Sequence, residues 1–268
     1  MIIENESRNG NFTSSKIFHL VKTGKGENGF GSTAITYVKE KNIERKLGRS
    51  IETGAYSKDM AWGQFLEKRV FDMLEYGYVL CSQETRVHSK ISYWAGSTDL
   101  LFPKVKIGEI KCYQPKNFSQ YTDAILSHSV DILKQDCPEE YWQMVSNAII
   151  NKVPVAEAIS YMPYQSELAE LREMAEYYDG PDQWKYRFIA ESPDISLAFL
   201  PDGGYYKNLN RFEFEVPQED KDFLTERVLL AGTMLIKTPS LMLATHDEQV
   251  SATIIEPINI LSKLKKIS

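Results

Sequence analysis

The sequence predicts an α/β fold in which a mixed central sheet is flanked by helices. Short apolar segments of strand length alternate with longer amphipathic segments of helical spacing along most of the chain. Two apolar segments, 98–102 and 106–112, are separated only by a turn around Pro103-Lys104, which indicates two neighbouring strands. Alternation of this kind is typical of a sheet whose faces are covered by helices.

The first fifty residues predict two helices separated by a glycine-rich loop. Residues 13–22 are expected to form a short helix opened by Thr13-Ser14-Ser15, which are favourable N-cap types. The four glycines of the segment 24–31 predict a flexible loop. A second helix is expected over 33–46, and it ends near Gly48.

A third helix has the clearest pattern in the sequence. Ser57 is its N-cap, and apolar side chains recur at helical spacing as far as Gly77, namely Trp62, Phe65, Leu66, Val70, Met73 and Leu74. Beyond this helix the sequence predicts five short strands, at 78–81, 84–88, 91–95, 98–102 and 106–112.

The second half of the chain continues the alternation. Pro138, with Glu139 and Glu140, opens a helix that runs to about Asn151. The other expected elements are helices at 118–127, 166–177 and 218–236 and strands at 153–161, 184–191 and 211–216. The last thirty residues follow neither period and are expected to form an irregular extension.

Length and composition indicate a soluble globular protein. The 268 residues suffice for one large domain or two small ones, and 43% hydrophobic and 12% aromatic residues argue against disorder. No apolar run approaches the roughly 20 residues that span a bilayer, and the N-terminus lacks the features of a signal peptide. Three cysteines, Cys81, Cys112 and Cys137, indicate reduced thiols and a cytoplasmic location.

The net charge of −6 counts against a nucleic-acid partner, because proteins that bind nucleic acids are usually basic. Binding depends on local charge, however, so basic clusters still matter. The candidates are Lys39/Lys41/Arg45/Lys46/Arg49, Lys104/Lys106/Lys111/Lys116 and Lys263/Lys265/Lys266. Each cluster is equally compatible with a solvated surface.

Two carboxylates and a lysine lie on the two neighbouring strands. Asp99 belongs to the first strand, and Glu109-Ile110-Lys111 belongs to the second. Alternate residues of a strand point to the same side, so Glu109 and Lys111 emerge together. Two hard oxygen ligands beside a cation suit Mg²⁺ and the water that it activates, which is the chemistry of phosphodiester hydrolysis. The alternative is an exposed hairpin with mixed charges.

Further polar residues lie on the predicted helices. Gly63 and Glu67 are four residues apart and therefore share one helical face, where the glycine would allow a backbone or a nucleic-acid strand to come close. Gln143 lies one turn into the helix that begins at Pro138. Without other information, Glu67 is equally a salt-bridge partner of a neighbour, and Gln143 a surface residue.

The order Gly-x-x-x-Glu, Asp, Glu-Ile-Lys and a helical Gln resembles the lambda-exonuclease-like (YqaJ) branch of the PD-(D/E)XK nucleases. The N-terminal segment Arg8-Asn9-Gly10-Asn11-Phe12-Thr13-Ser14-Ser15 also has the order of that family's arginine, glycine and Thr-x-Ser. The resemblance covers about residues 8–161. The chain departs from the family at Ser97-Thr98-Asp99-Leu100, where Ser-Pro-Asp-Gly is usual, and in a longer segment from Gly24 to Gly48.

This resemblance implies a restriction-endonuclease-like (PD-(D/E)XK) core and a set of site residues. One nuclease domain would span 1–268, with the catalytic core at about 8–161 and an extension at about 162–268. The implied catalytic residues are Glu67, Asp99, Glu109, Lys111 and Gln143. The implied ligands of two Mg²⁺ ions, for which Mn²⁺ would substitute, are Glu67, Asp99, Glu109 and the backbone carbonyl of Ile110.

The same resemblance assigns roles to the other residues. Lys111 would deprotonate or position the attacking water, with a pKa lowered by burial and by the metal charge. Gln143 would orient Lys111 or that water. Arg8 and Ser15 would hold the 5′-phosphate of the strand being cut, because a guanidinium and a hydroxyl at a helix N-terminus form an anion site.

The function implied is a metal-dependent 5′→3′ exonuclease. It would degrade linear double-stranded DNA and leave 3′ single-stranded overhangs for phage-type recombination. The implied partners are DNA ends, a single-strand annealing protein and two further copies of the chain in a homotrimer, without a membrane. Two alternatives stay open, namely an endonuclease of the same fold in restriction or repair and a non-catalytic DNA-binding protein on that fold.

Overall fold

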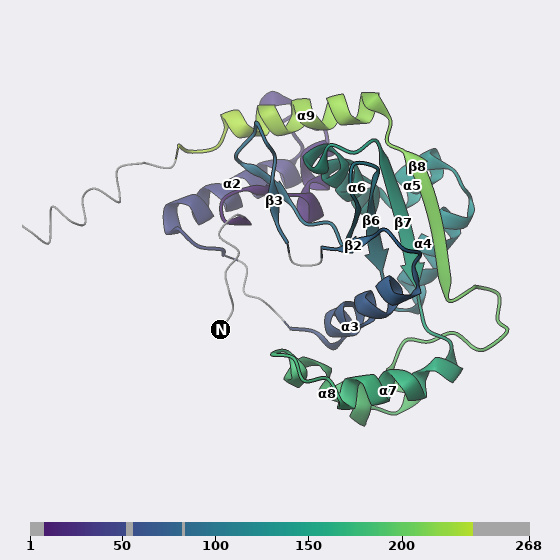
Figure 1. The fold of residues 1–268 in the computed structure, drawn as a ribbon. Helices are drawn as coiled ribbons and strands as arrows, with labels where there is room; N and C mark the ends of the chain where they lie inside the picture. The colour runs from purple at the N-terminus through teal and green to yellow at the C-terminus, as the bar shows by residue number, and fades with distance from the viewer. Residues whose placement is uncertain (1–7, 52–55, 82–83, 238–268) are drawn as a thin grey trace, which may run out of the picture. The chain divides into compact units, whose positions relative to one another are not determined.

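The computed structural model describes residues 8–51, 56–81 and 84–237 (Figure 1). The chain divides into one unit that ends at Leu235 and a second that begins at Ile236, and the fold described here is that of the first unit. The expected irregular extension and the basic cluster Lys263/Lys265/Lys266 therefore lie outside the described residues.

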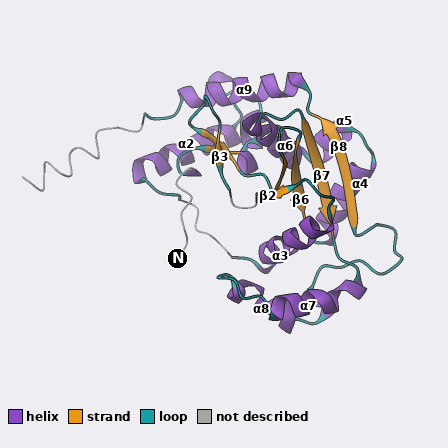
Figure 2. Cartoon of the chain, in the orientation of Figure 1, coloured by secondary structure: helices purple, strands orange, loops and turns teal. Residues whose placement is uncertain are grey.

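The central sheet contains five strands in the order β2-β5-β6-β7-β8 (Figure 2). These strands are Val79–Leu80, Leu100–Phe102, Lys106–Lys111, Val155–Tyr161 and Leu209–Glu215. The neighbours β6 and β7 are parallel, whereas the other pairs are antiparallel. The mixed central sheet predicted from the sequence is confirmed.

A smaller sheet brings the N-terminal segment toward the centre of the fold. It consists of β1 (Phe12–Thr13), β4 (Trp94–Gly96) and β3 (Arg86–Val87), with β1 parallel to β4. Phe12 pairs with Trp94, and both side chains are fully buried. Burial of these two rings fixes the position of the segment that follows Arg8.

Helices cover both faces of the central sheet (Figure 1). The α-helices are α1 Phe18–Val21, α2 Ser32–Leu47, α3 Lys58–Met73, α4 Pro115–Leu126, α5 Val130–Asp136, α6 Pro138–Asn151, α7 Leu168–Glu176, α8 Gln183–Glu191 and α9 Gln218–Thr233. The 3₁₀ turns are η2 Ser14–Lys16, η3 Glu27–Gly29, η4 Gln165–Glu167 and η5 Asp194–Ser196. Within the described residues, none of these helices has the length and apolarity to cross a bilayer.

The alternation of strand β6 separates two hydrophobic cores. Ile107 packs into one core with residues of α1, α2, α6 and α9, whereas Ile110 packs into the other with residues of α3, α7 and α8. Glu109 and Lys111 are two and four residues after Ile107, so their side chains point to the same face of the sheet, which is the face that α6 covers. Glu67, on α3, belongs to the opposite layer.

Most predicted helices are confirmed, and their ends follow the expected capping chemistry. The Ser57 hydroxyl accepts a hydrogen bond from the Met60 amide (3.1 Å) at the start of α3. Helix α2 ends at Gly48, whose φ of 67° is the left-handed conformation that glycine adopts at little cost. Helix α6 begins at Pro138 and ends at Asn151, as predicted.

Three expectations about secondary structure need correction. Residues 184–191, expected as a strand, belong to helix α8, because Tyr186 and Ile189 are buried at a spacing of three against α7 and α3. Helix α5 occupies a segment for which no element was predicted. The helix expected over 13–22 is reduced to the 3₁₀ turn η2 and the single turn α1.

Candidate active site

Glu109, Lys111 and Gln143 are in direct contact. The Lys111 Nζ donates hydrogen bonds to Glu109 Oε1 (3.0 Å) and to Gln143 Oε1 (3.2 Å). The Gln143 Nε2 in turn donates to Glu109 Oε1. Strand β6 supplies the first two residues by its period of two, and α6 supplies the third from its second turn. The three polar groups expected from the sequence therefore form one closed network.

Asp99 lies beside this network, directly before strand β5. Its Oδ2 accepts a hydrogen bond from the backbone amide of Ile110 (2.8 Å). The register of the two antiparallel strands, in which Leu100 pairs with Gly108, brings Asp99 next to Glu109 and Ile110. The structure thus brings together Asp99, Glu109, Lys111 and Gln143.

Asn147 is a polar residue of this network that the sequence interpretation did not include. Its Nδ2 donates to the Ser97 carbonyl (2.9 Å) and to Glu109 Oε2 (3.4 Å). Asn147 is fully buried, and its Oδ1 has no hydrogen-bond partner among the described residues. The signal that would have identified it is its position four residues after Gln143, on the same face of the predicted helix.

The electrostatics of the network follow from burial and from the proximity of like charges. Burial, and next to it the Asp99 carboxylate, together raise the pKa of Glu109 to about 8, although Lys111 opposes the shift. Burial likewise raises the pKa of Asp99, and Lys111 and the Ile110 amide only partly offset this effect. The protein environment therefore stabilises the negative charge of the two carboxylates only in part.

The expected lowering of the Lys111 pKa includes the effect of the metal charge, so it stays a prediction for the metal-bound protein; without metal the pKa is shifted upward. Burial alone would lower it, but the Glu109 and Asp99 carboxylates outweigh burial and hold the pKa above its ordinary value of 10.5. In this network Lys111 is a protonated hydrogen-bond donor. It is equipped to position a water or a phosphate oxygen.

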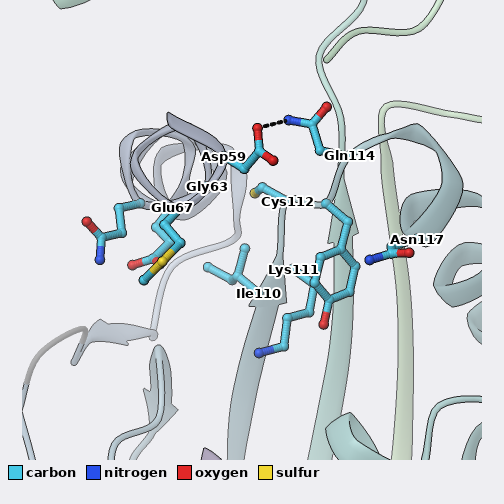
Figure 3. A pocket seen from close by; sticks show the side chains of 11 residues that line it. Asp59, Gly63, Glu67, Ile110, Lys111, Cys112, Gln114 and Asn117 are labelled. Carbon is cyan, nitrogen blue, oxygen red and sulfur yellow. Dashed lines mark hydrogen bonds between the residues drawn. The ribbon is translucent and has the colours of Figure 1, made fainter. Parts of the chain in front are cut away.

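A pocket of about 430 Å³ opens beside the network, between α3 and the end of β6 (Figure 3). Glu67 lines it from α3 and Lys111 lines it from β6. The Gln114 side-chain amide donates to Asp59 (2.9 Å) and joins the two walls. A Cβ added to Gly63 would lie 3.6 Å from the nearest atom, the Cys112 carbonyl oxygen, so protein packing alone does not require glycine there.

The donor set fits a divalent cation in chemistry, although the side chains are not gathered around one point. Asp99 and Glu109 are adjacent hard oxygen donors whose charge the protein only partly neutralises, and Glu67 adds to the repulsion at Glu109. Within the described residues, no three Asp, Glu, His or Cys side chains lie close enough together to hold a metal ion. The ligand set, which includes the Ile110 carbonyl, stays a prediction.

Arg8 and Ser15, the residues expected at a 5′-phosphate, lie together at the surface. Arg8 Nη2 is 3.4 Å from Ser15 Oγ, and both residues are exposed. Because Ser15 lies within the 3₁₀ turn Ser14–Lys16 and only one α-helical turn follows, the expected contribution of a helix N-terminus does not apply. A guanidinium and a hydroxyl that face each other remain as donors to an anion.

Helix α6 connects this surface pair with the buried network. The hydroxyls of Ser14 and Ser146 are hydrogen-bonded (2.8 Å), and the Trp94 indole donates to Ser146 Oγ (2.8 Å). Ser146 lies between Gln143 and Asn147 on α6. One helix thus holds both the Glu109 carboxylate and the turn that bears Ser15.

Comparison with known proteins supports the fold. No protein-family model matches the chain, and no curated protein sequence is a significant match. Among solved structures, the alkaline exonuclease LHK-Exo from Laribacter hongkongensis, determined in complex with dAMP, is 16% identical with a TM-score of 0.54. That match covers 86% of this chain and 91% of LHK-Exo.

A phage-related exonuclease from Haemophilus somnus 129PT is also similar. It is 16% identical with a TM-score of 0.51, over 84% of this chain and 92% of the exonuclease. The chain therefore has the α/β fold of alkaline and phage-related exonucleases. The resemblance found in the sequence, and the PD-(D/E)XK-like core that it implied, are confirmed as a likeness of fold.

Proposed function

We propose that this protein is a metal-dependent 5′→3′ exonuclease that degrades linear double-stranded DNA and leaves 3′ single-stranded overhangs. The main support is the closed network of Glu109, Lys111 and Gln143 with Asp99 beside it, next to a pocket. The fold adds to this support because two similar structures are those of an alkaline exonuclease and a phage-related exonuclease.

Mg²⁺ is the cofactor that suits this site, with Mn²⁺ as a substitute. Glu67, Asp99, Glu109 and the Ile110 carbonyl would hold two ions, which supply Lewis-acid stabilisation of phosphate oxygens and an activated water. Lys111 would direct its ammonium at the attacking water or at a phosphate oxygen. Gln143, bonded to both Lys111 and Glu109, would keep their side chains in one arrangement.

The pocket and the Arg8/Ser15 pair suggest how the substrate is bound. A pocket of about 430 Å³ is of the size that a nucleotide requires, and LHK-Exo was crystallised with dAMP. A mononucleotide product is consistent with both observations. Arg8 and Ser15 would donate hydrogen bonds to the terminal 5′-phosphate, which favours digestion from that end.

Three further proposals rest on the resemblance alone. The protein would act in the cytoplasm of a bacterial or phage-infected cell, it would form a homotrimer around DNA, and it would transfer its overhang to a single-strand annealing protein. Sedimentation of the purified chain would test the trimer.

Digestion of linear duplex DNA tests the proposed activity. With Mg²⁺, we expect degradation of a duplex with phosphorylated 5′ ends, retention of a closed circular duplex and no degradation in EDTA. Lys111→Ala is expected to lower the rate by at least about a hundredfold, since one positioned charged donor contributes that much. Cleavage of the circle would favour the endonuclease alternative. Absence of both cleavage and calorimetric Mg²⁺ binding would favour the non-catalytic alternative.

A further inference from the structure

The turn that bears Arg8 is held by two consecutive residues of helix α2. The Gly10 amide donates a hydrogen bond to Glu44 Oε2 (2.9 Å), and the Arg45 Nε donates to the Gly10 carbonyl (2.7 Å). Both backbone polar groups of one loop residue are therefore bound by the same helix. The Arg45 Nη2 also approaches Asn11 Oδ1 (3.5 Å), and the Asn11 amide donates to the Arg8 carbonyl (3.2 Å).

The contact between α2 and this turn is buried and sterically specific. Glu44 is 2% exposed, and its Oε2 also accepts a hydrogen bond from the buried Lys41 (2.9 Å). Gly10 has a φ of +66°, and a Cβ there would lie 2.5 Å from Arg45 Cγ. A buried ion pair that contacts a surface loop carries a desolvation cost, which is offset only where all its partners are in place.

We propose that Glu44 and Arg45 are positioning residues that hold the Gly10 turn, so that Arg8 faces Ser15, and that they thereby set the selectivity for a phosphorylated 5′ end. This inference rests on the proposed function of Arg8 and Ser15. The physical reason is preorganisation. A loop that is already ordered loses less conformational entropy when it binds an anion.

An alternative role for Arg45 is to attract DNA directly by its charge, but the direction of its side chain argues against this role. Arg45 is half-buried, and its guanidinium is directed at the loop backbone. Its neighbour Lys46 is exposed and carries the same charge, and within the described residues no hydrogen bond or ion pair joins it to the loop. Lys46 therefore provides a control that changes the charge of α2 while the turn keeps its contacts.

The test compares binding of a short duplex with and without a 5′-phosphate, measured by fluorescence anisotropy in EDTA so that no hydrolysis occurs. The wild-type protein is expected to prefer the phosphorylated duplex by about tenfold, and Arg8→Ala to abolish that preference. Arg45→Met is expected to reduce the preference several-fold. Lys46→Met is expected to weaken the binding of both duplexes equally and to leave the preference for the 5′-phosphate unchanged.

Two results would overturn the inference. One is an unchanged phosphate preference in Arg45→Met. The other is that Arg45→Met lowers the affinity for the phosphorylated duplex as much in the Arg8→Ala protein as in the wild type, since coupled residues are not additive. If circular dichroism shows that Arg45→Met is unfolded, Gly10→Ala, which strains the same turn, is expected to reduce the preference and decides the question. Absence of cleavage in Mg²⁺ with an intact preference would refute only the proposed hydrolysis.

Discussion

At the scale of single residues, the site is organised around the Glu109 carboxylate. One oxygen accepts hydrogen bonds from Lys111 and Gln143, and the other accepts from Asn147. These donors offset part of the cost of burying a carboxylate, but Asp99 adds a second one within the same environment. The carboxylates are therefore held in place at an energetic cost to the protein, as expected for residues retained for function.

Asp99→Asn is expected to stabilise the metal-free protein and to abolish hydrolysis. Burial raises the pKa of Asp99 above its ordinary value of 3.8, so the folded state disfavours the charged form that predominates at neutral pH. The amide oxygen of asparagine can still accept from the Ile110 amide. Because Asp99 keeps some solvent contact, we expect a gain of only about 1 kcal/mol.

Because the pKa of Asp99 is raised in the folded state, the stability gained by Asp99→Asn depends on pH. A raised pKa means that the wild type loses stability as the pH rises above about 4, where the unfolded carboxyl ionises. The gain of Asp99→Asn should therefore be absent near pH 3 and grow toward pH 7 in thermal unfolding with EDTA. The exposed Asp179→Asn serves as a control for the charge change and should show no such growth. Equal unfolding temperatures of wild type and Asp99→Asn at pH 7 would contradict the argument.

At the scale of elements, α6 is the helix that connects the two parts of the candidate site. Three of its residues, Gln143, Ser146 and Asn147, contact Glu109 or the Ser14 turn. The helix was predictable because its Pro138 start and its apolar face are local signals. Asn147 shares the Gln143 face of this helix, but its partners, the Ser97 carbonyl and Glu109, are far away in the sequence.

Asn147→Ala tests whether α6 orients Glu109. We expect kcat to fall by about tenfold, because Glu109 Oε2 loses a donor, with little change in KM. The control is Asn151→Ala, one turn further along, whose side chain bonds Arg86 and the Asn147 carbonyl and makes no bond to Glu109. Both variants should lose stability, but only the first should lose kcat. An equal loss of kcat in both would indicate a general effect of helix stability.

Helix α8 and the Arg45 contact illustrate what the local sequence could not predict. The segment Trp184-Lys185-Tyr186-Arg187 alternates as a strand does, and only its packing on α3 and α7 selects the helix. Lys41 and Arg45 belong to a basic cluster in the sequence, yet Lys41 is buried beside Glu44 and Arg45 binds Gly10. Tertiary partners decide whether a charged residue is solvated, and a single sequence does not contain them.

At the scale of the whole chain, positive charge is concentrated in the N-terminal part. The segment from Arg8 to Ser50 contains nine basic and three acidic residues, although the full chain has a net charge of −6. Exposed Lys22, Lys25 and Lys39 line one groove of about 640 Å³ between the glycine-rich loop and the start of α2. An acidic protein can therefore present a basic surface in its N-terminal part.

Replacement of Lys22, Lys25 and Lys39 by glutamine is expected to weaken duplex binding in a salt-dependent way. Each phosphate contact that is lost should reduce the slope of log affinity against log salt by about 0.9. The triple variant should therefore show a markedly shallower slope than the wild type in EDTA, while its preference for a 5′-phosphate is retained because Arg8 and Ser15 are unchanged. The control replaces three exposed lysines outside the named basic clusters, Lys90, Lys152 and Lys207, with the same total charge change. If the control reduces the slope as much, the attraction depends on net charge alone, and the groove beside α2 has no special part in DNA binding.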